Sequence, residues 1–244
     1  MTSARLAPGI DLDKRDAAEA VFEGYRAGLR LPRPTLLDEQ ATGLRPYVAL
    51  SDNDREKFWQ EVEAYPAADP PTAVVEGLRE SLPRDASIQR FASRVKGGGS
   101  LGRPRYVAIA VWNGGRIVRE AKALVPSAWD WVHGATSARS RFLDLGRGAF
   151  RSPDPFLDVH NGFVFRRIAA DSRKLEFDDN SDVALEAELL RAMGYELASI
   201  HAADRRDRTR AIEDDLAARP PDWLHQAARR AHAAVEADFE AWKA

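Results

Sequence analysis

Apolar and polar residues follow two different periods along the chain, and the change of period separates helical segments from strands. Toward both ends, apolar positions recur roughly every three to four residues, which predicts helices with one face against a core. The expected helices cover residues 14–31, 52–65, 72–82, 183–203, 209–218 and about 224–242. Between residues 87 and 124 the pattern instead predicts strand, glycine-rich loop, strand, turn and strand.

Two Asn-Gly pairs indicate β-hairpins in the middle of the chain. Asn113-Gly114 is followed by Gly115, and Asn161-Gly162 lies between apolar runs rich in β-branched and aromatic residues. Both central residues of a type I′ turn need positive φ, which asparagine and glycine tolerate best. The segment between these hairpins, as far as Phe150, has a helical pattern.

These elements predict an α+β fold: a small antiparallel sheet with a glycine-rich loop, packed with N-terminal and C-terminal helices. We expect a helical segment over 1–86, the sheet over 87–180 and a C-terminal helical segment over 181–244, together forming one compact unit. Core or inter-lobe packing is expected for Trp112, Trp129 and Trp131, because buried aromatic rings dominate core energetics. The buried stripe of the helix at 183–203 is expected to be Leu185, Leu189, Met193, Leu197 and Ile200. The last helix is expected to carry its apolar residues on one face: Leu224, Ala228, Ala231, Val235, Phe239 and Trp242.

Composition narrows the classes of function. The chain of 244 residues is 44% hydrophobic and 30% charged, with a net charge of −2, which gives no general attraction to nucleic acid or anionic lipid. It has no cysteine, which excludes disulfides and thiolate sites. No apolar run reaches the roughly 18 residues of a membrane span, and the first residues lack a secretory signal. We therefore expect a cytoplasmic protein without nucleic-acid or membrane partners.

The glycine-rich stretch "KGGGSLGRPRYVAIAVW" is the strongest candidate for chemistry. Gly97, Gly99 and Gly102 match G-x-G-x-x-G, but a dinucleotide-binding loop of that pattern must open a helix, and a strand follows here. A glycine loop between strands, with a basic residue on the third strand, instead fits the nucleotide-covering lobe of kinase-like folds. Lys122 supplies that cation. The alternative is that the glycines only form a turn and that Arg119 and Lys122 are solvated strand residues.

Three long motifs carry a family resemblance: "RVKGGGSLGRPRYVAIAVWNGGRIVREAKALVPSAW", "FVFRRIAADSRKLEF" and "LLRAMGYELASIHAADRRDRTRAIEDDLAARPPDWLHQAA". They resemble the bacterial domain-of-unknown-function family numbered twenty-two fifty-two, whose members look like distant, rearranged relatives of kinase-like phosphotransferases. The resemblance implies ATP and Mg²⁺ as ligands. It places the nucleotide-binding residues at Gly97, Gly99, Ser100 and Gly102, with Arg119 or Lys122 on the third strand. Residues three apart on a strand face opposite sides, so only one of the two cations can point at a phosphate, and Lys122 is favoured.

One departure from the family limits the expected activity. The upstream motifs that would supply the catalytic base and the metal-binding carboxylates are not found in residues 1–244, so the chain resembles the C-terminal portion of a longer member. Phosphoryl transfer needs Mg²⁺ and a group that orients the nucleophile. We therefore assign no catalytic residue and no metal ligand, and expect an inactive or weakly active nucleotide-binding portion. A homo-oligomer or a complementing N-terminal polypeptide is the expected partner, and the alternative is a structural or protein-interaction module that binds no nucleotide.

Overall fold

The structure is a computed structural model that describes residues 12–35, 44–45, 49–95, 102–134, 140–172, 183–203 and 206–243. It is an α+β protein that divides into two compact units. The helical unit comprises Met1–Ala49, Gly148–Arg151 and Lys174–Ala244, and the sheet unit comprises Leu50–Arg147 and Ser152–Arg173. The division joins the first helix to the last ones, unlike the three successive segments expected from the sequence.

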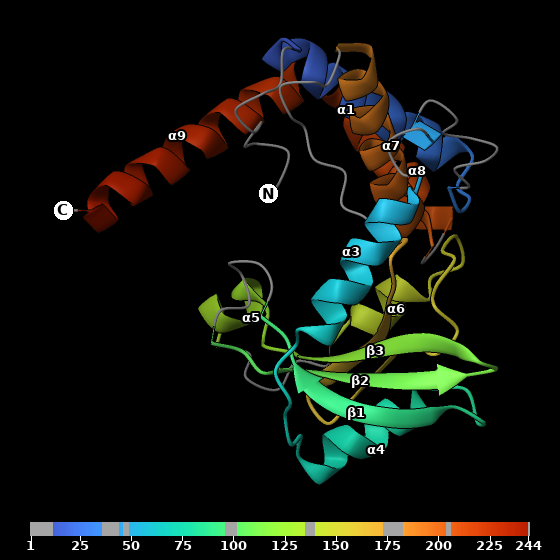
Figure 1. Cartoon of the computed structure of the whole chain (residues 1–244). Helices are drawn as coiled ribbons and strands as arrows, with labels where there is room; N and C mark the ends of the chain where they lie inside the picture. The colour runs from blue at the N-terminus through green and yellow to red at the C-terminus, as the bar shows by residue number, and fades with distance from the viewer. Residues whose placement is uncertain are drawn as a thin grey trace. The chain divides into compact units, whose positions relative to one another are not determined.

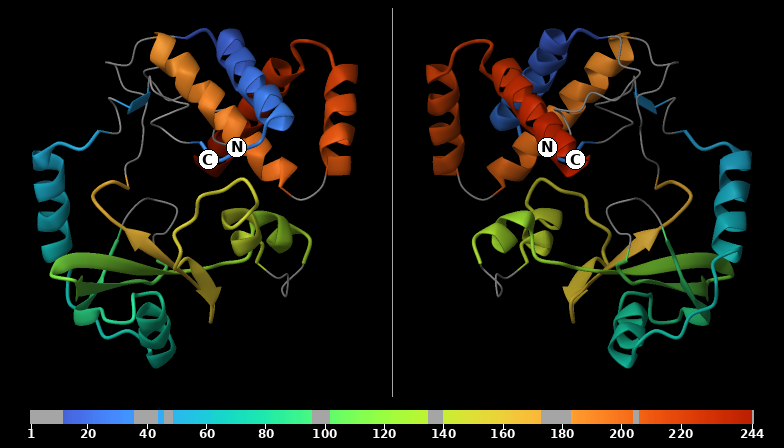
Figure 2. Two further views of the ribbon diagram at one scale, coloured as in Figure 1. Left: turned by 90° about the vertical axis from the view of Figure 1, so that its right-hand side faces the viewer. Right: turned by 90° about the vertical axis from the view of Figure 1, so that its left-hand side faces the viewer.

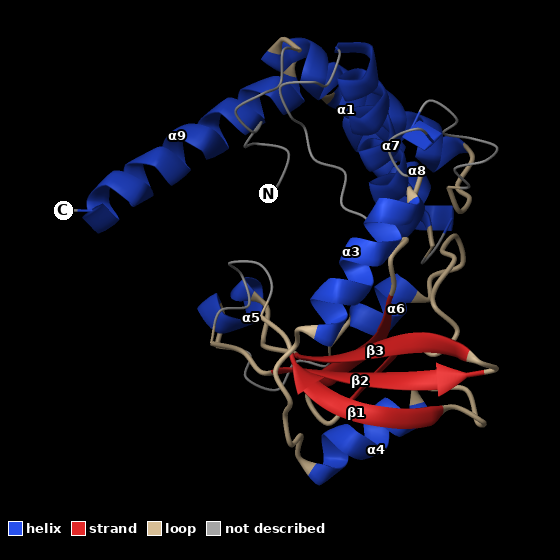
Figure 3. Cartoon of the chain, viewed as in Figure 1, coloured by secondary structure: helices blue, strands red, loops and turns tan. Residues whose placement is uncertain are grey.

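The sheet unit contains a five-stranded antiparallel sheet with the strand order β1-β2-β3-β5-β4. Figure 3 shows β1, β2 and β3 side by side in red. Its strands are β1 (Ser87–Ser93), β2 (Arg105–Trp112), β3 (Gly115–Ala123), β4 (Asp158–His160) and β5 (Phe163–Ile168). Both expected hairpin turns are present, with φ of 48° and 77° at Asn113 and Gly114, and 50° and 76° at Asn161 and Gly162. These positive values are the backbone that a type I′ turn requires, so the Asn-Gly pairs fix the β2–β3 and β4–β5 connections.

Two helices of this unit pack on opposite faces of the sheet (Figure 1). The end of α3 (Asp52–Glu63) contributes Val62 to a core with Val107, Val118 and Ile168. On the other face, α4 (Thr72–Glu80) contributes Val74 and Leu78 to a core with Ala108, Ala121 and Phe165. Two short helices complete the unit, α5 (Ala128–Val132) and α6 (Phe142–Gly146). Alternate residues of each strand therefore belong to an α3 face and an α4 face.

Arg90 of β1 holds the end of α3 on the sheet. Its guanidinium donates hydrogen bonds to the carbonyl oxygens of Tyr65 at 3.0 Å, Val62 at 2.8 Å and Glu63 at 3.0 Å. The last carbonyls of a helix have no partner within the helix, and a cation there also suits the helix dipole. A Ser51–Asp54 capping box closes the other end of α3.

The helical unit is built around two helices that lie side by side, α1 (Lys14–Arg30) and α7 (Val183–Ala202), as Figure 2 shows in blue and orange. Glycines bring the two backbones together: a Cβ on Gly24 would lie 1.9 Å from the Arg191 carbonyl oxygen, and a Cβ on Gly194 would lie 2.0 Å from that of Val21. The unit is completed by α8 (Arg206–Ala218) and α9 (Trp223–Lys243).

This close contact corrects the stripe expected for α7. Met193 and Leu197 are exposed, and the residues that α7 buries are Glu186, Leu190, Gly194, Ala198 and Ser199. The contact face is set by small side chains that allow backbone approach, whereas the sequence argument followed large apolar ones.

The core position expected for the tryptophans is also wrong, and the alternative of packing between lobes stays a prediction. Trp112, Trp129 and Trp131 are 41%, 71% and 81% exposed. Trp129 and Trp131 belong to the five-residue α5, which buries no residue, and Trp129 stacks on His133 with ring centroids 3.9 Å apart. None of the helices described here is long and apolar enough to cross a lipid bilayer.

Candidate functional site

The predicted nucleotide-binding residues fall partly outside the described part of the chain. Gly97, Gly99 and Ser100 lie outside the described residues. Gly102 has a φ of 75° and is exposed, and a Cβ there would meet no atom within 4 Å. The positive φ at position 102 therefore favours glycine, and close packing does not require it.

Arg119 lies on the α4 face of the sheet, where it holds the segment before β4. Its Nη1 donates to the Asp154 carboxylate at 2.6 Å and its Nη2 to the Phe156 carbonyl oxygen at 2.8 Å. Nε is 3.4 Å from the Ser81 hydroxyl at the end of α4. Burial lowers the pKa of the guanidinium, while the Asp154 charge opposes that shift. Arg119 thus has a structural role.

Lys122 lies on the other face, as the alternation of a strand requires. It is partly exposed, and across the β2–β3 ladder it stands directly opposite Arg105. Two cations at directly opposed positions of an antiparallel pair repel each other. This end of the α3 face therefore carries a concentration of positive charge.

Next to this pair lies a group that we call the arginine cluster: Glu120 with Arg94, Arg105 and Arg166. One carboxylate oxygen of Glu120 accepts from Arg94 at 2.7 Å and from Arg105 at 3.1 Å. The other oxygen accepts from Nε and Nη2 of Arg166 at 2.8 and 2.7 Å. The Glu120 side chain is 0% exposed, while those of Arg94 and Arg105 are 9% and 8% exposed.

The charges of the arginine cluster shift one another's protonation. Burial by itself raises the pKa of Glu120, but the charge of Arg166 and the hydrogen bonds from Arg94 outweigh it, so the pKa lies below its usual value. Burial acts to lower the pKa of Arg94, yet its bonds to Glu120 leave that pKa raised. Glu120 and Arg94 therefore carry opposite charges near neutral pH. The Nε of Arg94 is buried and has no hydrogen-bond partner among the described residues.

The cluster also has a defined place in the hairpin. Arg94 directly follows β1 and Arg105 opens β2, so both flank the segment that contains Gly97, Gly99 and Ser100. The sequence argument did not select Arg94, Arg105 or Glu120. A usable signal was present, because a strand flanked by two others is expected to be apolar, and β3 carries three charged residues within four positions, Arg119, Glu120 and Lys122.

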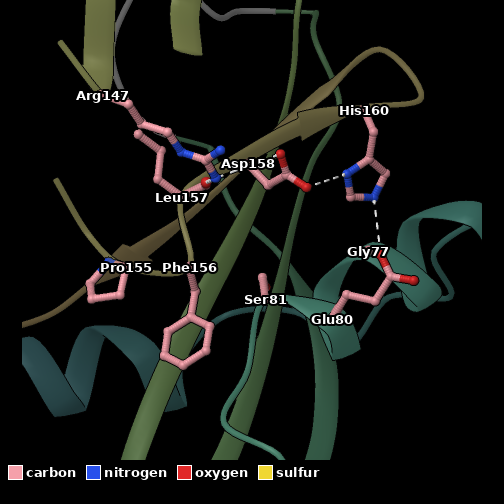
Figure 4. A pocket seen from close by; sticks show the side chains of 9 residues that line it. All are labelled: Gly77, Glu80, Ser81, Arg147, Pro155, Phe156, Leu157, Asp158 and His160. Atoms are coloured by element: carbon pink, nitrogen blue, oxygen red, sulfur yellow. Dashed lines mark hydrogen bonds and ion pairs between the residues drawn. The ribbon is translucent and has the colours of Figure 1, made fainter. Parts of the chain in front are cut away.

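A small cavity of about 170 Å³ lies on the α4 side of the sheet unit (Figure 4). Its polar wall places His160 between Asp158, with Nδ1 at 3.2 Å from the carboxylate, and Glu80, at 3.9 Å from Nε2. Arg147 lies 3.9 Å from Asp158. The His160 ring stacks on Phe165 with centroids 4.3 Å apart.

The charged groups of this cavity do not favour an anionic ligand. One guanidinium, Arg147, lies beside two carboxylates, Glu80 and Asp158, so the lining has no excess of positive charge. The nearby Ser81 hydroxyl donates to the Leu78 carbonyl oxygen at 2.9 Å and is buried, so it is not poised as a nucleophile. A Cβ on Gly77 would lie 2.5 Å from the His160 ring, so the cavity is closely packed on that side.

No group of three or more histidine or carboxylate residues suited to a metal ion occurs among the described residues. Both oxygens of Glu120 are taken by guanidinium groups, so this carboxylate does not offer itself to Mg²⁺ either. His201, one of the five histidines, instead accepts or donates a hydrogen bond at 2.7 Å with the Tyr25 hydroxyl. Arg167 pairs with Asp171 at 2.8 Å.

No family model, no curated protein and no solved structure matches the chain. The resemblance to a kinase-like family therefore stays a prediction. What favours one function over another is the arrangement of charges on the α3 face.

Proposed function

We propose that the α3 face of the sheet binds a phosphate-bearing ligand, a nucleoside triphosphate such as ATP being the best candidate, and that this chain performs no phosphoryl transfer alone. The single observation that carries the proposal is the position of Lys122 opposite Arg105, beside the arginine cluster. Arg105 opens β2, directly after the glycine-rich segment, and Lys122 lies opposite it on β3.

A bound polyphosphate would relieve the repulsion at this end of the sheet. Like charges directly opposed across two strands destabilise the pair, and an anion between them turns repulsion into two attractions. Lys122 and Arg166 offer the accessible groups, since Lys122 is partly exposed and the Arg166 side chain is 42% exposed. Arginine suits phosphate because its planar fork presents parallel N–H donors. Glu120 would orient Arg166 toward the ligand.

The described residues contain no candidate group of carboxylates for a metal ion, so the proposal is restricted to binding. The Mg²⁺ implied by the family resemblance requires oxygen ligands from the protein or from the nucleotide phosphates. Among the described residues, no group of three or more histidine or carboxylate side chains could hold a metal ion, so these residues do not fit a dedicated Mg²⁺ site. We therefore derive no catalytic step for this chain.

The test is thermal unfolding of the purified chain with ATP, ADP and inorganic triphosphate in turn, followed by calorimetric titration. A ligand at 100 times its Kd adds about 2.7 kcal/mol of stability. Lys122→Ala is expected to weaken ATP binding by at least tenfold. Lys57→Ala, which removes an exposed lysine from α3, is the matched control and is expected to leave binding unchanged.

The alternative is a structural or interaction module without a nucleotide. Unfolding curves that do not move with any of the three anions would support that alternative and overturn the proposal. Stabilisation by sulfate equal to that by ATP would indicate a general anion site instead of a nucleotide site.

A further inference from the structure

The second half of α9 carries an apolar stripe that its own unit does not cover. Val235 and Phe239 are each 48% exposed and Trp242 is 79% exposed. Figure 1 shows this half of the helix extending away from α1 and α7. We propose that α9 pairs antiparallel with α9 of a second copy of this chain, centred on Val235.

The start of α9 is firmly attached, which makes the rest of the helix a rigid extension. Trp223 packs against the cluster of Leu29, Ala198 and Leu216, and its ring meets that of Phe22 edge-on at 5.9 Å. From Arg229 onward nearly every side chain is exposed. A helix of this length without a packed face is marginal in water, because packing of one face supplies most helical stability. The stripe needs a partner surface.

The sizes of the side chains along the stripe favour a second copy of the same helix. In an antiparallel pair centred on Val235, that residue meets its own symmetry mate. At equal distances on either side, Ala231 faces Phe239 and Ala228 faces Trp242. Each large ring is thus matched by an alanine, which is how facing helices fill their shared space at native density. A parallel pair would place Trp242 against Trp242 and Ala228 against Ala228, leaving clashes and voids.

The charges beside the stripe select the same orientation. The basic residues Arg229 and Arg230 lie in the first half of the exposed segment, and the acidic residues Glu236, Asp238 and Glu240 lie in the second half. An antiparallel pair sets the basic half of each helix against the acidic half of the other. A parallel pair sets like charges together, which is unfavourable. Size and charge are independent features of the sequence, and both favour the antiparallel orientation.

The first experiment measures mass by light scattering during size-exclusion chromatography. The chain is expected to run at twice its 27.1 kDa mass at micromolar concentration. Val235→Glu is expected to give a monomer with unchanged far-UV circular dichroism and unchanged unfolding of the sheet unit. Ala233→Glu, on the opposite side of the helix, is the control and is expected to remain a dimer. A wild-type monomer at 100 µM, or a dimer that persists in Val235→Glu, overturns the proposal.

The second experiment fixes the orientation, and the lack of cysteine makes it clean. Val235→Cys is expected to cross-link two chains on mild oxidation, because the two copies of this residue are adjacent. Trp242→Cys is expected not to, since seven residues at about 1.5 Å each place it about 10 Å from the centre in each chain. The two displacements are opposite, so the two copies lie roughly 20 Å apart. Cross-linking at both positions would show a parallel pair and overturn the register.

Discussion

Glu120→Gln is the most direct perturbation of the arginine cluster, because it removes one negative charge with almost no change in shape. In the wild-type chain the two oxygens of Glu120 accept hydrogen bonds from Arg94, Arg105 and Arg166. The amide of glutamine keeps one acceptor oxygen and presents an N–H₂ donor to guanidinium groups that can only donate. At least one arginine therefore loses its acceptor.

The magnitude follows from which charges are left buried. The side chains of Arg94 and Arg105 are 9% and 8% exposed, so neither is freely solvated when its counter-charge disappears. The Arg166 side chain is 42% exposed and can turn to water at little cost. Removing one partner from a buried ion pair costs about 3–5 kcal/mol, a large share of the roughly 5–15 kcal/mol that holds a typical domain together.

Urea unfolding followed by circular dichroism measures this loss, together with hydrogen exchange of β2 and β3. A denaturant slope of about 1–3 kcal/mol per molar converts the expected loss into a midpoint lower by more than 1 M. Glu63→Gln is the control: its partner Arg116 lies at 2.5 Å, but the two side chains are 66% and 46% exposed. An exposed pair is worth about 0–1 kcal/mol. A loss below 1 kcal/mol in Glu120→Gln would refute the buried, paired state of the cluster.

The stability difference between wild type and Glu120→Gln depends on pH in a direction set by the pKa of Glu120. The cluster lowers the pKa of Glu120 in the folded chain, so the unfolded chain takes up the proton first as the pH falls. The stabilisation is complete above the ordinary glutamate value of about 4.3 and is lost as the pH falls through the lowered folded value. The difference between wild type and Glu120→Gln should therefore be constant near neutral pH and shrink only in acid.

Two further predictions concern the helical unit. Burial lowers the pKa of His201, so below about pH 6.5 the unfolded chain binds a proton more readily than the folded chain does. The wild-type chain should therefore lose stability in mild acid, whereas His201→Gln should not. Hydrogen exchange of α1 measures this difference. Gly194→Ala should lower the free energy of unfolding by about 1–3 kcal/mol or more in urea titrations, because its Cβ would lie 2.0 Å from the Val21 carbonyl oxygen. Gly115→Ala, whose Cβ would approach no closer than 3.6 Å to the Trp112 carbonyl oxygen, should cost less.

The sequence predicts the elements of this fold better than their packing. The Asn-Gly pairs define both hairpins because the chemistry of a type I′ turn is contained in two neighbouring residues. The buried face of α7 was misjudged because it depends on Gly24 and Gly28 of α1, more than 160 residues earlier in the chain. Hydrophobic period alone favours Met193 and Leu197 and has no means of finding a contact made by small residues.

In the candidate site, too, the sequence predicts the local features and misses those that depend on distant residues. Alternation along β3 predicts that Arg119 and Lys122 face opposite sides, and the register confirms it. Which side each faces depends on distant partners, Asp154 for Arg119 and the strand β2 for Lys122. The arginine cluster joins a residue that follows β1 with residues of β2, β3 and β5, so no local motif could have shown it.

The arginine cluster and Lys122 can be separated by experiment, and this separation decides between a structural and a binding role. Apolar residues of similar volume often stabilise a core as well as a buried ion pair does, so stability alone does not require these charges. A purely structural cluster predicts that Glu120→Gln lowers stability while Lys122→Ala changes nothing. A ligand site predicts that Lys122→Ala leaves the unfolding of the free chain unchanged and removes only the stabilisation that ATP adds. Since Lys122 is partly exposed and stands outside the Glu120 hydrogen bonds, its effect on the ATP-dependent part isolates the binding role.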